Sequence, residues 1–192
     1  TIQFRVCKLS MLMSSKLLKL RLIIFFWKIF GKINSIRSRN EMNWGNTKNN
    51  KILIVFPIDE PSFRVACYTF RDLGRNNINN KQFIFIVRKE FKDLFHLHFG
   101  YTLYIEYVKQ GTILLEEKSL IDLLKQNIFD YIIDLNPYFQ LSIARFISLL
   151  QSEIKVGFLS EFSDNFYNIQ LDVSKTGIME KGFKQINGML NQ

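Results

Sequence analysis

Short apolar runs alternate with helical patterns along residues 51–158, and this alternation constrains the fold more than any other feature. The strand-like runs are KILIVF (51–56), QFIFIV (82–87), YTLYIEYV (101–108), DYIIDL (130–135) and IKVGF (154–158). Runs this rich in β-branched and aromatic residues need cover on both faces, and helices between them supply it. The pattern predicts an α/β fold with a doubly wound, mainly parallel Rossmann-like sheet. We expect at least five strands, centred near Ile54, Phe85, Ile105, Ile132 and Val156.

Helical patterns occupy residues 62–74, 117–126 and 139–151, between the expected strands. After Phe158 the sequence is less regular. There, NIQLD (168–172) is a candidate last short strand, and TGIMEKGFKQINGML (176–190) has apolar residues at helical spacing. We expect that last helix to pack on the core.

The positive charge of the chain is confined to its N-terminal segment. The net charge is +9, yet residues 1–50 hold ten Lys and Arg against the single acid Glu41, and residues 51–192 hold sixteen of each sign. A nucleic-acid-binding domain normally carries a basic patch on its folded body. The neutral body therefore argues against a nucleic-acid partner.

A basic amphipathic helix is expected over residues 1–40, followed by a polar linker at 41–50 and a Rossmann-like domain at 51–192. The apolar run Leu22 to Trp27 is far shorter than the ~20 residues of a membrane-spanning helix. On a helical wheel, one face carries Arg21, Lys28, Lys32, Ser35 and Arg39, and the rest carries Leu18, Leu22, Phe25, Phe26, Ile29 and Ile33.

Such a helix is typical of a surface location. It can lie on an anionic membrane, with contacts from Arg21, Phe25, Phe26, Trp27, Lys28 and Lys32, or it can dock on the body of the protein. A cleaved targeting segment is the third alternative. It is disfavoured because small residues do not follow the apolar core.

Three loops should meet at the carboxyl edge of the sheet, where open α/β sheets bind ligands: PIDEPS (57–62), DLNPY (134–138) and LSEFSDN (159–165). Asp59, Glu60, Asp134 and Asn136 would then share one edge. Neighbouring carboxylates can act as acid and base or hold a metal. Alternatively, Asp59, Glu60 and Ser62 cap the helix that follows, with Pro61 in its first turn.

No cofactor or metal site is expected from the motifs. Pro57 and Pro61 stand where a dinucleotide-binding fold has glycines, and no glycine-rich phosphate loop follows any strand. His96 and His98 have no third metal ligand nearby in the sequence.

Two blocks resemble the N-terminal half of the family 9 glycosyltransferases, the heptosyltransferase-like enzymes of lipopolysaccharide core assembly. They are KILIVFPIDEPSFRVACYTFRDL (51–73) and FDYIIDLNPYFQLSIARFISLLQSEIKVGF (129–158). The second block is the more specific, with matches at Asp130, Asp134, Leu135, Ala144, Lys155, Gly157 and Phe158. The resemblance implies one half of a GT-B fold. It also implies an acceptor-sugar site that includes Asp134, Asn136 and Tyr138.

Two departures from that family count against catalysis by this chain alone. The first loop of the family has a Gly-Asp pair whose Asp is the proposed general base, and the pair aligns with Pro61 and Ser62. Asp59 or Glu60 would have to replace that base, because a serine hydroxyl does not accept a proton unaided at neutral pH. The family also has a second, donor-binding domain, and this chain ends before it.

The resulting expectation is a bacterial, heptosyltransferase-like acceptor domain of surface-glycan assembly, held at the cytoplasmic face of the membrane by its N-terminal helix. Its expected partners are an anionic membrane surface, a sugar or glycolipid acceptor, and a separate donor-domain protein. The alternative is a non-catalytic membrane-surface binding or scaffold protein that retains the fold.

Overall fold

The computed structural model describes residues 17–31, 33, 50–73, 81–108, 112–115, 124, 126–173 and 178–190. The chain divides into two compact units, Thr1–Ser35 and Ile36–Gln192. The second unit contains the sheet, and the first contains a helix over residues 17–29. The linker predicted at 41–50 lies almost entirely outside the described residues.

The sheet has the strand order β4-β3-β2-β1-β5-β6-β7. The strands are β1 (Lys51–Val55), β2 (Gln82–Arg88), β3 (Tyr101–Val108), β4 (Thr112–Leu115), β5 (Ile128–Asp134), β6 (Gln151–Phe158) and β7 (Ile169–Leu171). Every neighbouring pair is parallel except β3 and β4. The predicted fold class is confirmed, and all five predicted strand centres fall inside strands.

The antiparallel edge strand β4 was not expected from the sequence. Only three residues separate it from β3. A parallel pair needs a crossover of a dozen residues or more. A connection of three residues therefore permits only antiparallel pairing.

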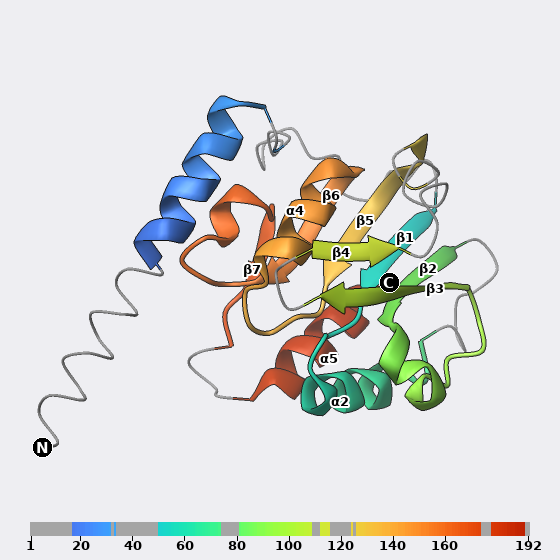
Figure 1. Ribbon diagram of the computed structural model, residues 1–192. Coiled ribbons are helices and arrows are strands. Elements are labelled where there is room, and N and C mark those ends of the chain that lie inside the picture. Colours follow the sequence, from blue (N-terminus) through green and yellow to red (C-terminus); the bar gives the residue numbers. More distant parts are fainter. Residues whose placement is uncertain are drawn as a thin grey trace, which may run out of the picture. The chain divides into compact units, whose positions relative to one another are not determined.

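In the described residues the sheet is flanked by helices α2 (Glu60–Phe70), α4 (Leu141–Leu149) and α5 (Met179–Leu190). The short 3₁₀ helices η3 (Lys89–Leu94) and η4 (Ser163–Asn165) lie in the connections. Figure 1 shows α2 and α5 on one face of the sheet and α4 on the other. Opposite faces follow from right-handed crossovers, because the chain moves from β1 to β2 in one direction and from β5 to β6 in the other. Of the helix predicted at 117–126, the structure describes only Leu124 and Gln126, both helical.

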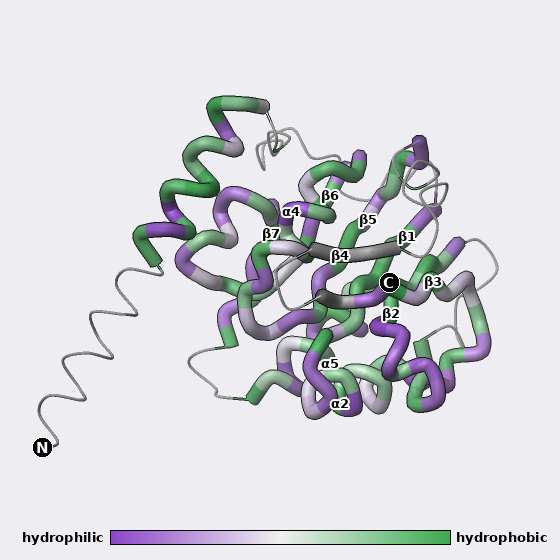
Figure 2. Tube along the Cα trace, in the orientation of Figure 1, coloured by the Kyte–Doolittle hydropathy of each residue, from purple (hydrophilic) through white to green (hydrophobic). Residues whose placement is uncertain are grey.

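The core beneath α2 and α5 is built largely from phenylalanine. The rings of Phe63, Phe70, Phe85 and Phe95 lie 5.1–6.2 Å, centroid to centroid, from the ring of Phe56. Figure 2 shows hydrophobic residues in the central strands β1 and β5. Since Phe56 directly follows β1, this cluster fixes the start of the loop 57–62.

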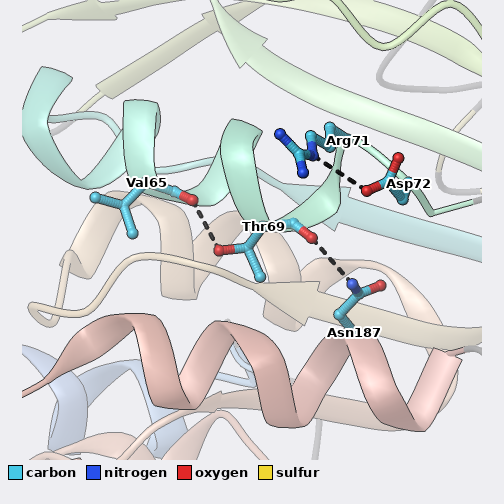
Figure 3. Close-up of polar contacts among 5 residues, drawn as sticks. All are labelled: Val65, Thr69, Arg71, Asp72 and Asn187. Carbon is cyan, nitrogen blue, oxygen red and sulfur yellow. Dashed lines mark hydrogen bonds and ion pairs between the residues drawn. The ribbon is translucent and has the colours of Figure 1, made fainter.

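The C-terminal helix α5 packs against α2. The Asn187 side-chain amide donates a 2.9 Å hydrogen bond to the Thr69 carbonyl, and the Thr69 hydroxyl donates one of 2.9 Å to the Val65 carbonyl (Figure 3). At Gly182, a Cβ atom would lie 2.7 Å from the Phe158 ring. Helix α5 therefore comes close to both α2 and the end of β6, and the expected last helix is confirmed.

The helix of the first unit ends at a glycine. The Gly31 N–H donates a 3.2 Å hydrogen bond to the Lys28 carbonyl, and Gly31 has φ +63°, a conformation that terminates helices. The wheel drawn from the sequence thus applies to residues 17–29, while Lys32, Ser35 and Arg39 lie outside the described residues. None of the helices in the described ranges is long and apolar enough to cross a membrane.

Candidate functional site at the switch edge

The chain leaves β1 and β5 toward opposite faces of the sheet, although the two strands are neighbours. We call this place the switch edge, meaning the carboxyl ends of β1 and β5 with the loops 56–62 and 135–140. Open α/β sheets bind ligands at such points. The Leu135 N–H donates a 2.9 Å hydrogen bond to the Val55 carbonyl, and the Ile58 N–H donates one of 3.0 Å to the Asn136 side-chain oxygen. Both loops therefore start side by side, as predicted.

Asp59 and Glu60 begin helix α2. Asp59 is the N-cap, with extended backbone, and its Oδ2 accepts a 3.0 Å hydrogen bond from the Ser62 N–H. Glu60 pairs with Arg64 one turn later at 2.7 Å, and both side chains are more than half exposed. Pro61 lies in the first turn. The capping interpretation is confirmed for Asp59, whose side chain holds the first turn of α2, but the Ser62 hydroxyl takes no part in the cap.

Ser62, which aligns with the expected general base, is buried inside the first turn of α2. The residue is 1% exposed. Its hydroxyl has no hydrogen-bond partner within the part of the chain that the structure describes. Its backbone N–H serves the Asp59 cap. In this conformation the hydroxyl is out of reach of a ligand at the surface.

Asp134 and Asn136 form a buried polar network. Asp134 Oδ1 accepts hydrogen bonds from the Asn136 backbone N–H at 2.9 Å and from its side-chain amide at 2.6 Å. Asp134 Oδ2 accepts one from the Tyr167 hydroxyl at 2.5 Å. Asp134 is 2% and Asn136 4% exposed. Because Asn136 also binds the Ile58 N–H, this network joins β5 to the loop after β1.

Burial and hydrogen bonding act in opposite directions on the Asp134 carboxyl. Burial raises its pKa above the ordinary value, and the hydrogen bonds from Tyr167 and Asn136 oppose part of that rise. Burial, and then the negative charge of Asp134, raises the pKa of the Tyr167 phenol well above its usual range. Tyr167 therefore stays protonated as the donor to Asp134.

Tyr167 was missed by the sequence analysis, although Gly157 offered a signal. A Cβ atom at Gly157 would lie 2.8 Å from the Tyr167 ring, so the ring packs directly on the β6 backbone. A glycine inside a strand often marks such a close approach. The segment before Tyr167 also packs on the switch edge, where the Phe139 ring lies 5.4 Å from Phe162 and 5.7 Å from Phe166. The predicted loop 159–165 thus lies close to the loop after β5.

Arg88, at the carboxyl end of β2, is a second residue that the sequence analysis missed. Its Nη1 donates a 3.0 Å hydrogen bond to the Ile58 carbonyl, and its Nη2 forms an ion pair with Glu90. The guanidinium carbon lies 5.4 Å from the centre of the Phe91 ring. The side chain is 25% exposed. Arg88 therefore holds the loop after β1 from the side opposite Asn136.

Tyr138 differs from the other two predicted acceptor-binding residues, because it is 67% exposed while Asp134 and Asn136 are buried. Leu159, which follows β6, is 52% exposed. The solvent-facing side chains of the switch edge thus include Glu60 and Tyr138, and Asp59 is partly exposed, as is Arg88 at the neighbouring end of β2. Asp134 and Asn136 support the loops from beneath.

Lys155 is a buried amine on the α4 side of the sheet. It is 7% exposed, and its Nζ donates a 3.4 Å hydrogen bond to the Ser148 carbonyl in the last turn of α4. Burial lowers its pKa from 10.5 to about 8. The carboxyl end of a helix favours a cation, which offsets part of the cost of burying this charge.

Neither a family model nor a curated protein matches this sequence. Solved structures do resemble this chain. The chain is similar to E. coli heptosyltransferase WaaC with ADP, with a TM-score of 0.55 and 15% identity over 72% of this chain and 46% of that one. The same enzyme with ADP-2-deoxy-2-fluoro heptose gives a TM-score of 0.53 and 15% identity over 72% and 47%. The likeness shows a shared fold, and this chain spans about half the length of those enzymes.

Proposed function

We propose that residues 51–192 are a glycosyltransferase-like acceptor domain that binds a sugar or glycolipid of surface-glycan assembly at the switch edge. The observation that carries this proposal is the fold similarity to a heptosyltransferase over 72% of the chain. The sequence resemblance to family 9 glycosyltransferases is consistent with it, since its more specific block covers most of β5, α4 and β6.

The solvent-facing side chains of the switch edge suit a sugar acceptor. Tyr138 offers an exposed aromatic ring, which can pack on the apolar face of a sugar, and Asp59 and Glu60 offer oxygens that accept hydrogen bonds from hydroxyls. Arg88 holds the loop that presents Asp59 and Glu60, through its hydrogen bond to the Ile58 carbonyl. The buried network of Asp134, Asn136 and Tyr167 would fix the loops that present these groups.

Glycan binding is tested by titrating the full chain with lipopolysaccharide core oligosaccharides and following the heat of binding. Tyr138→Ala should weaken the affinity at least tenfold. The matched control is Tyr101→Ala, because Tyr101 is also exposed, at 58%, but begins β3 at the opposite edge of the sheet. Equal losses in both variants, or no binding by the unmodified chain, would overturn the proposal.

Catalysis by this chain alone is not part of the proposal. Ser62 is buried, Asp59 caps α2 and Glu60 pairs with Arg64, so no well-placed general base faces the switch edge among these three residues. We propose that donor binding comes from a second domain, in a longer polypeptide or in a separate protein.

Incubation with nucleotide-heptose and nucleotide-hexose donors and core acceptors should therefore give no transfer by residues 1–192. Product formation that disappears in Asp59→Asn would contradict this expectation and identify Asp59 as the base. The same assay with Tyr138→Ala would separate acceptor binding from proton transfer.

A non-catalytic scaffold is the second candidate. It is favoured by the burial of Ser62 and by the exposure of Tyr138 and Leu159 on adjoining loops, which suits a partner protein. If the glycan titrations show no binding, the scaffold role replaces the acceptor domain as the proposed function.

A further inference from the structure

The helix over residues 17–29 exposes many of its apolar side chains, whereas Ile24 on the opposite side of the helix is 4% exposed. Five of them fall within an arc of about 100° on the helical wheel, and Phe30 follows directly after the helix. They are Leu18, Leu22, Phe25, Phe26 and Ile29, between 49% and 60% exposed, with Phe30 at 67%. A helix of a soluble domain normally turns such a face to the core. We call these six side chains the apolar face.

The aromatic members of this face form one continuous patch. The Phe25 and Phe26 rings lie 5.9 Å apart, centroid to centroid, edge to face, and the Phe26 and Phe30 rings lie 6.2 Å apart and are stacked. Large exposed apolar patches mark contacts with another protein or with a membrane.

Basic residues border the apolar face on both sides. Arg21 and Lys28, two turns apart, lie along one border of the face, and Lys19 lies along the other. All three side chains are exposed. No Asp or Glu occurs in the first 40 residues. Figure 2 shows this helix as mostly hydrophobic, interrupted by hydrophilic positions. Long Lys and Arg side chains at the border of an apolar face can keep their charges in water while the face is buried.

We propose that the helix over residues 17–29, together with Phe30, is an interfacial anchor that inserts its apolar face into the surface of an anionic lipid bilayer. The axis would lie in the plane of the membrane, with Lys19, Arg21 and Lys28 at the level of the headgroups. This inference does not depend on what the sheet domain binds.

Charge complementarity favours an anionic bilayer over a second copy of this chain. The first 50 residues carry ten Lys and Arg and one acid, so two copies that paired through this helix would bring like charges together. Phosphate headgroups can pair with those positive charges. The acyl region can take up the aromatic side chains without a surface of matching shape.

Co-sedimentation of the full chain with vesicles tests the proposal, using phosphatidylcholine with and without 30% phosphatidylglycerol. We expect binding to the anionic vesicles at least tenfold tighter than to the neutral ones in 50 mM salt, and markedly weaker binding in 500 mM salt. Phe25→Ser with Phe26→Ser and Ile29→Ser should lower binding at least tenfold at every salt concentration. Lys19→Gln with Arg21→Gln and Lys28→Gln should remove most of the preference for anionic vesicles.

The matched control is Tyr68→Ser with Tyr101→Ser, since both tyrosines are about as exposed as the phenylalanines but belong to the sheet domain. Its vesicle binding should equal that of the unmodified chain. Insertion is read separately with Phe26→Trp in a background of Trp27→Phe and Trp44→Phe, by quenching of the introduced indole with brominated acyl chains.

Three results would overturn the anchor. One is equal vesicle binding by the serine variant and the control. Another is a fall in the urea midpoint of the serine variant, which would mean that the apolar face stabilises the fold. The third is concentration-dependent self-association of the unmodified chain in sedimentation velocity that the serine substitutions abolish, without vesicle binding. Loss of glycan binding by Tyr138→Ala leaves all these readouts unchanged, so the two proposals fail separately.

Discussion

Asp59, in the loop after β1, and Asp134, the last residue of β5, both belong to the switch edge, and they have opposite environments. Asp59 is partly exposed and uses one carboxylate oxygen to cap α2. Asp134 is 2% exposed and accepts three hydrogen bonds from Asn136 and Tyr167. Two carboxylates that look equivalent in the sequence thus have different roles. The one near solvent can meet a ligand, and the buried one holds the loops in place.

The difference arises from what packs over each strand end. The segment after β6 brings Tyr167 onto Gly157 and over Asp134, whereas the loop after β1 leads directly into its helix. Removal of each side chain should therefore affect stability in proportion to its burial and to its bonded partners.

Asp134→Ala should have the largest effect. It leaves the Tyr167 hydroxyl and the Asn136 donors buried without their acceptor, so we expect a loss of about 3 kcal/mol in the free energy of unfolding. The measurement is urea denaturation followed by circular dichroism. Asp134→Asn is the control, because it keeps an oxygen for Asn136 and should lose only about 1 kcal/mol. Equal losses would mean that the charge, rather than the hydrogen bonds, matters.

Lys155 should make the free energy of unfolding depend on pH. Its pKa is about 8 in the folded chain against 10.5 ordinarily, so between these values the unfolded chain binds more protons and stability rises with pH. The rise is worth about 3 kcal/mol. Lys155→Met should be more stable than the unmodified chain at pH 7 and lose that advantage by pH 10.5.

Urea midpoints at pH 7, 8, 9 and 10 compare Lys155→Met with Lys181→Met, a substitution at an exposed lysine of α5. The curve for Lys181→Met should run parallel to that of the unmodified chain. A parallel curve for Lys155→Met as well would show that the buried amine does not titrate in this range.

Asp59→Ala should cost about 1 kcal/mol, the usual value for loss of an N-cap. Asp59→Asn retains the acceptor for the Ser62 N–H and should change stability little. Thermal unfolding of the two variants distinguishes them. If Asp59→Ala lost as much stability as Asp134→Ala, the contrast between the exposed and the buried carboxylate would be wrong.

Ser62→Ala should have the smallest effect, below about 0.5 kcal/mol, because it removes a buried hydroxyl that has no hydrogen-bond partner. Urea denaturation checks this value. A loss above 1 kcal/mol would reveal a partner for the hydroxyl and would reopen a role for Ser62 at the switch edge.

Local patterns in the sequence determined the order of the elements. Runs of β-branched and aromatic residues predicted β1, β2, β3, β5 and β6, because such runs fit a sheet covered on both faces. Asp59 before Glu60 and Pro61 predicted the start of α2, because helix capping depends on residues only three positions apart. The antiparallel strand β4 escaped, since an edge strand of four residues carries little periodic signal.

The tertiary structure alone decided which polar residues of the switch edge are buried. Asp134 and Tyr167 lie 33 positions apart in sequence, and Ile58 and Asn136 lie 78 apart. Pairings over such distances depend on how α4, β6 and the segment after β6 pack together, which short-range patterns do not encode. The sequence by itself therefore placed the candidate residues at one edge of the sheet, and long-range packing assigned Asp134 and Asn136 to support and left Tyr138 and Glu60 facing solvent.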